Sequence, residues 1–398
     1  PLTLLLTHLG TVGLLAMVMI GSLYQMAPVV ASAPIPRVRL AHVVHGLILS
    51  GLLLVSLCLS GTFGRWLTYG FYLIWTGIML FLVQAACSGL RKKTGNETVH
   101  GMRLALGSLF LAATLGSAMA HVFTGSSWLG QRSLWLQVHM GIGLLGWVGG
   151  LLVSVSWQVV PMFYLTEPVS RRSMRWTLTL LLVGVILPLI ILLTEKAGYR
   201  GSGWLSPQNL AAFSALPAVF AVWCFHPIQT MNRLRHRRRK RVDSSIYFWF
   251  SGLCVALLTA CAAALTHLMT EPQFLAGTSL KAGLRMELIF VWLAVWGWAG
   301  LILHGMLTRI VPFLVWFHRF SPLVGLQPTP SVRALLPDRW TRINLGLHLA
   351  SVLAGLIAIW TRTETATRLT GLLLIATALS LLLLLLHVLR QKPTHPQT

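Results

Sequence analysis

The segment HMGIGLLGWVGGLLVSVSWQVVPMF, from His139 to Phe163, contains no Asp, Glu, Lys or Arg and decides the fold class of this chain. An apolar stretch of about 20 residues is long enough for an α-helix to cross the hydrocarbon core of a bilayer. Because lipid offers no hydrogen bonds, the backbone of such a segment must satisfy its own polar groups, and a helix does so. The segment therefore predicts a transmembrane helix.

Ten other apolar stretches are also long enough to cross a membrane as helices. With the first they predict eleven spans, at residues 4–30, 40–62, 68–90, 101–123, 137–164, 174–194, 209–230, 245–269, 286–317, 343–361 and 367–389. The composition agrees, since 56% of the residues are hydrophobic and only 10% are charged, whereas soluble domains carry about a quarter charged residues. No polar stretch is long enough to form a soluble domain. The sequence predicts an all-α polytopic membrane helical bundle, with residues 1–398 as a single domain.

The basic residues predict the orientation. Of the 31 Lys and Arg residues, 23 fall in one alternating set of loops and 8 in the other, and the basic side of a membrane protein faces the cytoplasm. We therefore expect an inner (plasma) membrane protein of bacterial type with Thr398 in the cytoplasm. A span before Pro1 would make twelve. The net charge of +23 is spread over short loops, so we expect the lipid bilayer, and no nucleic acid, as partner.

An internal repeat links three of the predicted spans. Its copies are HLGTVGLLAMVMIGSLYQMAPVV from His8, the segment from His139 quoted above, and LAVWGWAGLILHGMLTRIVPFLV from Leu293. When they are aligned on Pro28, Pro161 and Pro312, a glycine stands fifteen residues before each proline, and small residues stand twelve and seven before it. Small residues allow helices to approach closely. The alternative is that membrane helices are simply rich in glycine.

The three copies are the first, fifth and ninth spans, so they predict three successive four-helix units. These units cover residues of about 1–123, 137–269 and 286–390, and the first lacks its opening helix. We expect them to surround a pseudo-three-fold axis normal to the membrane.

Four histidines are expected at one depth, in the outer half of the membrane. His8 and His139 stand near the outer starts of their spans, and His121 and His267 near the outer ends of theirs. Imidazole is a common ligand of haem iron, and ionisable residues within membranes are rare unless they are functional. These residues predict a haem site with two imidazole ligands. The alternative is that each ring hydrogen-bonds a neighbour or lies at the headgroups.

A second group of histidines is expected toward the cytoplasm. His42 and His45 share a helix face because they are three residues apart, and they could form a second haem site with His348. The alternative is that these rings pack in the core or at the interface.

Twelve spans in three four-helix arcs, led by His-headed and Pro-ended spans, resemble subunit I of the haem–copper oxidase superfamily, including its nitric-oxide reductase branch. The resemblance implies a b-type haem and matches His8 to the family's low-spin haem ligand and His139 to a copper ligand. Two departures put a standard haem–copper dinuclear centre in doubt. Span 174–194 has no histidines where the family carries copper ligands, and the outer half of the span that contains the third copy, residues 286–300, has none where the family carries haem ligands.

The resemblance implies a haem-binding membrane protein that transfers electrons and, as an open question, reduces O₂ or NO. A cytochrome c-like donor or further membrane subunits would be its partners. The competing hypothesis is a non-enzymatic protein of the same fold: a haem or copper carrier, an assembly partner or a small-solute transporter. The five cysteines have no metal-finger spacing, and there is no phosphate-binding motif of the type GxxxxGK[ST] or GxGxxG. An ATP-driven pump is therefore not expected.

Overall fold

The computed structural model describes residues 2–60, 66–88, 96–121, 131–238, 243–270 and 280–393. Outside these ranges lie several residues used to predict the orientation, namely Arg65, Arg91, Lys92, Lys93, Arg239, Lys240, Arg241 and the last residue, Thr398. Within the described ranges the regular structure is entirely helical, and 11 helices are long and apolar enough to cross a membrane. This confirms the predicted helical membrane architecture and indicates an integral membrane protein.

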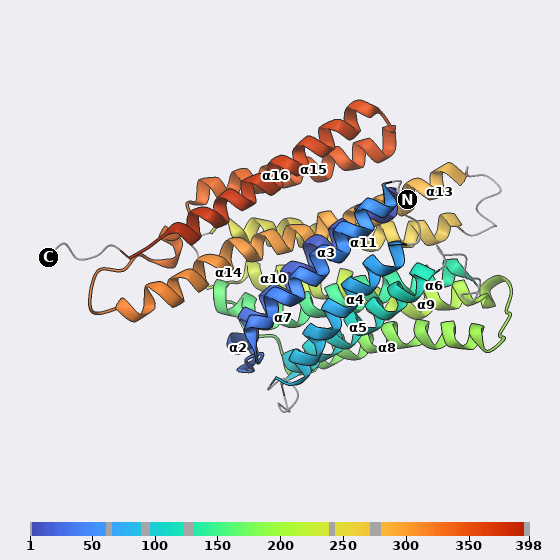
Figure 1. Cartoon of the computed structure of the whole chain (residues 1–398), viewed down its shortest axis with the longest axis horizontal. Coiled ribbons are helices and arrows are strands. Elements are labelled where there is room, and N and C mark those ends of the chain that lie inside the picture. The colour runs from blue at the N-terminus through green and yellow to red at the C-terminus, as the bar shows by residue number, and fades with distance from the viewer. Residues whose placement is uncertain are drawn as a thin grey trace. The chain divides into compact units, whose positions relative to one another are not determined.

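The chain forms two compact units, Pro1–Arg238 and Arg239–Thr398, whose boundary lies inside the second predicted repeat unit. Unit 1 contains seven spans (Figure 1). They are α1 (Leu2–His8) with η1 (Leu9–Ala16) and α2 (Met17–Ala31); α3 (Ala41–Leu59); α4 (Trp66–Ala86); α5 (Glu97–Ala120); α6 (Arg132–Gly141) with η5 (Ile142–Gly149) and α7 (Gly150–Tyr164); α8 (Arg171–Lys196); and α9 (Pro207–Phe220) with η7 (Ala221–Phe225) and α10 (His226–Arg235).

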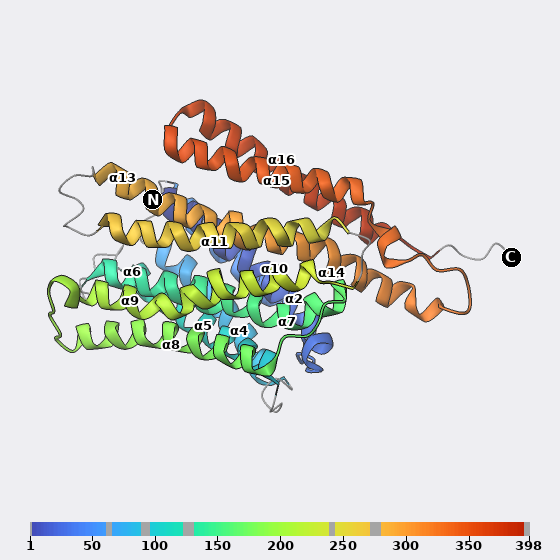
Figure 2. The ribbon, with the colours of Figure 1, turned by 180° about the vertical axis from the view of Figure 1, so that it is seen from behind.

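Unit 2 contains four spans. They are α11 (Ser245–Thr270); α13 (Leu280–Trp292) with η8 (Leu293–Gly300) and α14 (Leu301–Arg319); α15 (Asp338–Thr361); and α16 (Glu364–Arg390). Helices α15 and α16 pack side by side along their length, as do α8 and α9 in unit 1 (Figures 1 and 2).

Polar side chains mark the beginnings of several spans. The Ser170 hydroxyl accepts a hydrogen bond from the Ser173 amide at the start of α8, and Thr363 does the same for Ala366 at the start of α16. Such caps satisfy amides that the first turn of a helix leaves without partners. They define where these helices begin in regions where apolar composition alone leaves the boundary open.

The three repeat copies share a distortion that the sequence did not predict. Each contains an eight-residue π-helical segment, η1, η5 or η8, that begins 19 positions before the proline of its span and ends 12 before it. A π-helix widens the turn and breaks the regular i to i−4 hydrogen-bond ladder, and such segments are rare and often functional. The same distortion therefore stands at the same distance before Pro28, Pro161 and Pro312.

In both units, the helix before the π segment and the helix after it contact that segment in the same way. Helix α5 packs on η5 and α7 in unit 1, and α11 packs on η8 and α14 in unit 2. The helix that follows each long span, α3, α8 or α15, contacts the π segment of that span as well. The glycine fifteen residues before each proline lies in its π segment at one of these helix contacts. An added Cβ at Gly13, Gly146 or Gly297 would lie within 2.8 Å of Leu52, Ser108 or Val255.

We expect Gly146→Ala to destabilise the protein by about 1–3 kcal/mol, the usual cost of overpacking. The new methyl group would lie 2.5 Å from the Ser108 hydroxyl oxygen and 2.7 Å from its Cβ. Gly141→Ala in the same span is the matched control, because nothing lies within 4 Å of its Cβ position. That control should be neutral, or stabilising by up to about 1 kcal/mol. Thermal unfolding in detergent measures both, and equal stability of the two variants would contradict the close helix contact.

Candidate functional site

Unit 1 brings together the two histidines that head the first two repeat copies. His8 is the last residue of α1, directly before η1, and His139 lies in α6, three residues before η5. His8 packs on Phe71 of α4, the ring of His139 contacts α5, and α4 and α5 pack against each other. The two histidines are far apart in sequence, and the packing of these helices places them in the same region of unit 1.

The ring of His8 is held by its own helix and by α4. Its Nδ1 lies 2.9 Å from the main-chain oxygen of Leu4, one turn earlier. The ring of Phe71 on α4 approaches it edge-on, with 5.4 Å between ring centroids. Because a carbonyl oxygen only accepts hydrogen bonds, Nδ1 carries the proton and donates it.

The ring of His139 is held by α5. Its Nδ1 lies 3.0 Å from the main-chain oxygen of Ala112 and donates to it. One turn further along α5, Gly116 lets the ring approach, since a Cβ there would lie 2.9 Å from the imidazole Cε1. Helix α5 therefore fixes both the protonation and the position of this imidazole.

The two imidazoles are consequently in the same state. Each donates Nδ1–H to a main-chain carbonyl, so each Nε2 carries a lone pair, and neither Nε2 has a hydrogen-bond partner among the described residues. Histidines that bind metals usually donate their other ring N–H to a carbonyl or carboxylate in this way, which orients the ring and raises its basicity. The arrangement can offer two nitrogen ligands to one metal centre.

The other two histidines predicted at this depth lie in different surroundings. His121 follows α5, and its Nε2 lies 2.6 Å from the hydroxyl of Tyr72, so this nitrogen already has a partner. His267 lies near the end of α11, in unit 2, where it is half-buried. Their ligand roles stay predictions.

The histidines predicted for a second haem site belong to different units. In unit 1, both ring nitrogens of His45 face main-chain oxygens, Nδ1 that of Ala41 at 2.9 Å and Nε2 that of Met17 at 3.0 Å. These contacts favour a structural role for His45. In unit 2, His348 is fully buried, and its Nε2 lies 3.0 Å from the main-chain oxygen of Trp296 in η8. His42 is exposed.

Sequence reasoning missed the groups that orient these rings. The spacing of residues in the sequence did not indicate Phe71 as a neighbour of His8, or Gly116 and the carbonyl of Ala112 as neighbours of His139. Each lies on a helix distant in sequence from the histidine that it contacts. His304 was given no ligand role from the sequence, yet it is buried against His348. The spacing of Asn344 and His348, four residues apart on α15, was the one available signal that polar side chains share a buried face there.

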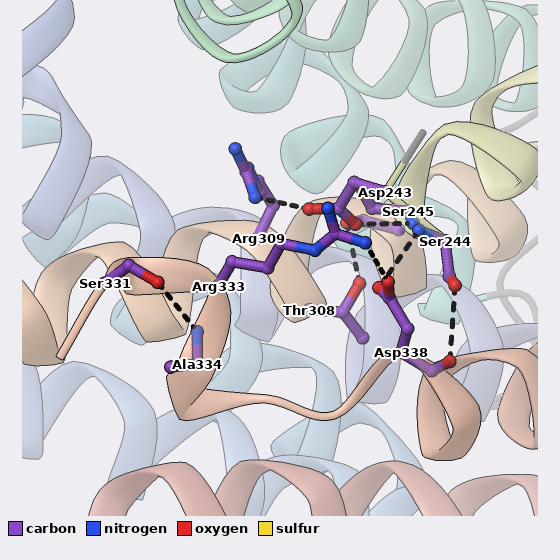
Figure 3. Close-up of polar contacts among 10 residues, drawn as sticks. Asp243, Ser244, Ser245, Thr308, Arg309, Ser331, Arg333, Ala334 and Asp338 are labelled. Atoms are coloured by element: carbon purple, nitrogen blue, oxygen red, sulfur yellow. Dashed lines mark hydrogen bonds and ion pairs between the residues drawn. The ribbon is translucent and has the colours of Figure 1, made fainter. Parts of the chain in front are cut away.

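A charged network lies at one end of unit 2 (Figure 3). The guanidinium of Arg309, inside α14, donates to the carboxylate of Asp243, just before α11. Arg333 pairs with Asp338 at the start of α15, and the Asp338 carboxylate also accepts from the Ser244 amide at 3.4 Å. The network ties α11, α14 and the segment before α15 together.

No group of three or more His, Cys, Asp or Glu side chains within the described ranges is arranged to hold a metal ion. No protein-family model, curated protein or solved structure matches this chain. The chemistry of the site therefore rests on its own residues. Among the described residues, His8 and His139 lie in one unit, and neither Nε2 atom has a hydrogen-bond partner there.

Proposed function

We propose that this chain is a haem-binding membrane protein in which Nε2 of His8 and Nε2 of His139 ligate the iron of a b-type haem. The observation that carries the proposal is their shared state, with each Nδ1–H donated to a main-chain carbonyl and each Nε2 left free. Two neutral imidazoles are a common ligand set for haem iron. Phe71, edge-on to His8, supplies an apolar aromatic surface of the kind that packs beside a porphyrin.

The two imidazole nitrogens fit the requirements of haem iron. Haem iron needs nitrogen ligands without protons on the ligating atom, and both Nε2 atoms meet that condition. When bound, haem supplies reversible one-electron transfer, and we propose electron transfer as the function of the protein.

We further propose that the chain is built of three oxidase-like repeats around a pseudo-three-fold axis. The three π segments at identical distances from Pro28, Pro161 and Pro312 support this arrangement. The matching order of helix contacts around η5 and η8 supports it as well.

The proposal is tested by the absorption spectrum of the purified protein, before and after reduction with dithionite. We expect a Soret band and the sharp visible bands of a low-spin b-type haem, with about one haem per chain by pyridine haemochromogen assay. Protein that is stably folded without haem, and that takes up none when haem is added, would contradict it.

A non-enzymatic role is the second candidate. It is favoured by the sequence of span 174–194, which has no histidines where the family that this chain resembles carries copper ligands. Consumption of O₂ or NO by the reduced protein would favour a reductase. Transfer of haem to an apoprotein acceptor without such consumption would favour a carrier.

The predicted orientation has its own test. We expect a reporter fused after Thr398 to be cytoplasmic, because the sequence assigns 23 of the 31 basic residues to that side of the membrane, and the basic side stays inside. A phosphatase fusion, active only in the periplasm, should be inactive there, and a green fluorescent protein fusion should fluoresce. The opposite pair of results would reverse the topology.

A further inference from the structure

Helix α15 buries its polar side chains and exposes its apolar ones. Asn344, His348 and Ser351 are 0% exposed, whereas Leu353 and Ile357 are 59% and 47% exposed. A helix on the surface of a water-soluble domain has the opposite arrangement, because burial of apolar surface drives folding in water. The outward side of α15 is therefore suited to contact with lipid.

Helix α16 continues this apolar surface and packs antiparallel to α15 (Figures 1 and 2). The amide of Asn344 donates to the main-chain oxygen of Thr377 at 3.0 Å, so residue 344 lies level with residue 377. Because one step back along α15 corresponds to one step forward along α16, residues 339–342 lie level with about residues 379–382. Side chains of α16 near this level are more than half exposed, namely Leu379, Leu382 and Leu383.

Two arginines and a tryptophan interrupt the apolar surface where α15 begins. Arg339 and Arg342 are both exposed, and they share one side of the helix because they are three residues apart. Trp340 is 46% exposed, and the guanidinium carbon of Arg339 lies 5.0 Å from the centroid of its indole ring. We call these three residues the arginine–tryptophan patch.

The patch has no acidic partner of its own. The described part of unit 2 contains four carboxylates, and three of them already pair with other arginines, namely Asp243 with Arg309, Asp338 with Arg333 and Glu364 with Arg368. The fourth, Glu287, lies five residues before Trp292, whose indole donates to the main-chain oxygen of Val352, toward the other end of α15. Neither Arg339 nor Arg342 forms an ion pair with a described residue. Two positive charges therefore lie beside a lipid-facing surface with no carboxylate of the described part of unit 2 to neutralise them.

We propose that Arg339, Trp340 and Arg342 bind the headgroup of an anionic phospholipid. The two guanidinium groups donate hydrogen bonds to its phosphate oxygens, and its acyl chains lie on the exposed leucines of α16. This inference is independent of the haem proposal, since it concerns other residues in the other unit and requires no haem.

The chemistry of the patch selects a headgroup with net negative charge. Guanidinium groups form paired hydrogen bonds with phosphate oxygens, which gives arginine an advantage over lysine at such sites. A choline or ethanolamine headgroup carries a cation beside its phosphate, and this cation would be repelled by Arg339 and Arg342. A glycerol headgroup carries no cation. Phosphatidylglycerol is therefore expected to bind more strongly than phosphatidylcholine.

The surrounding surface selects a lipid over a soluble anion. Leu382 and Leu383, near the level of Arg339, are 51% and 66% exposed, and acyl chains can cover them whereas a free phosphate cannot. Tryptophan side chains favour the headgroup level of a bilayer, which is where Trp340 would meet a phospholipid. Each basic residue beside an anionic membrane surface strengthens the attraction about fivefold, so two arginines should give about 30-fold.

The test is the quenching of Trp340 fluorescence by phospholipids with brominated acyl chains. The purified full-length protein is placed in phosphatidylcholine nanodiscs that contain increasing fractions of brominated phosphatidylglycerol or brominated phosphatidylcholine. The part of the signal that Trp340→Phe removes belongs to Trp340, which separates it from the rest of the 16 tryptophans. We expect phosphatidylglycerol to bind beside Trp340 about 30-fold more strongly than phosphatidylcholine.

Arg339→Gln/Arg342→Gln should abolish this preference, because it removes both guanidinium charges from the patch. The matched control is Arg362→Gln/Arg368→Gln, which removes two exposed arginines from the other end of the same hairpin. Arg368 already pairs with Glu364 there, so the control should keep the preference. Inorganic phosphate, added at constant ionic strength, should not displace the lipid.

Three outcomes would overturn the proposal. Equal quenching of Trp340 by both lipids would show that the patch does not select an anionic headgroup, and this comparison needs neither arginine variant. A preference that survives Arg339→Gln/Arg342→Gln would assign the selectivity to other residues. Displacement by inorganic phosphate would show that the patch binds a soluble anion instead of a lipid.

Discussion

His8→Ala and His139→Ala should each remove or shift the haem absorption of the purified protein. Each variant takes away one of the two free Nε2 atoms. The loss in haem affinity should exceed the roughly 10–100-fold that follows from loss of an outer group around a metal. A single variant that retains haem should change from a low-spin to a high-spin spectrum, because one of the two imidazole ligands would be missing. Visible spectroscopy and haem retention on a desalting column measure both effects.

The controls are exposed histidines at helix ends. His236 follows α10 and His318 lies in the last turn of α14, and His236→Ala and His318→Ala should leave the spectrum unchanged. Gly116→Val tests position without removing a ligand. Its side chain would begin 2.9 Å from Cε1 of His139, so it should displace the ring and shift the spectrum. If His8→Ala and His139→Ala both kept the parental spectrum, these residues would not be the ligands.

Asp243→Asn should destabilise the protein by about 2–3 kcal/mol. The change leaves Arg309 without its carboxylate partner, and both side chains are largely buried, with 11% of Arg309 and 17% of Asp243 exposed. Removing one partner of a fully buried ion pair costs about 3–5 kcal/mol because the other charge stays uncompensated. Asparagine keeps the oxygen that accepts from the Ser245 amide at the start of α11, so the variant isolates the charge. Unfolding in a denaturing detergent series measures the loss.

The matched control is an exposed ion pair of the same unit. Glu364 and Arg368 lie one turn apart on α16 with 77% and 76% of their side chains exposed, and Glu364→Gln should change stability by less than about 0.5 kcal/mol. Asp243→Asn/Arg309→Gln should recover part of the loss, since no charge is then left unpaired. Equal stability of Asp243→Asn and the parent would show that Arg309 does not depend on this carboxylate.

The sequence by itself determined the helices. A stretch such as His139–Phe163 has no charged side chain, and in lipid the backbone can satisfy its hydrogen bonds only by forming a helix. This local rule identified all 11 spans. The sequence also predicted a repeat, because Pro28, Pro161 and Pro312 stand at corresponding places in similar spans.

The tertiary structure decided how those helices pack against one another and which side chains meet. The π segments could not be predicted, because α and π turns accept the same apolar residues and neighbouring helices decide between them. The state of His8 and His139 depends on carbonyls and rings that face them, two of which lie on α4 and α5. The pairing of His304 with His348 depends likewise on how α14 and α15 are rotated. Apolar composition fixes which segments are helical, but it does not fix the rotation of a helix about its axis, and that rotation decides which polar atoms meet.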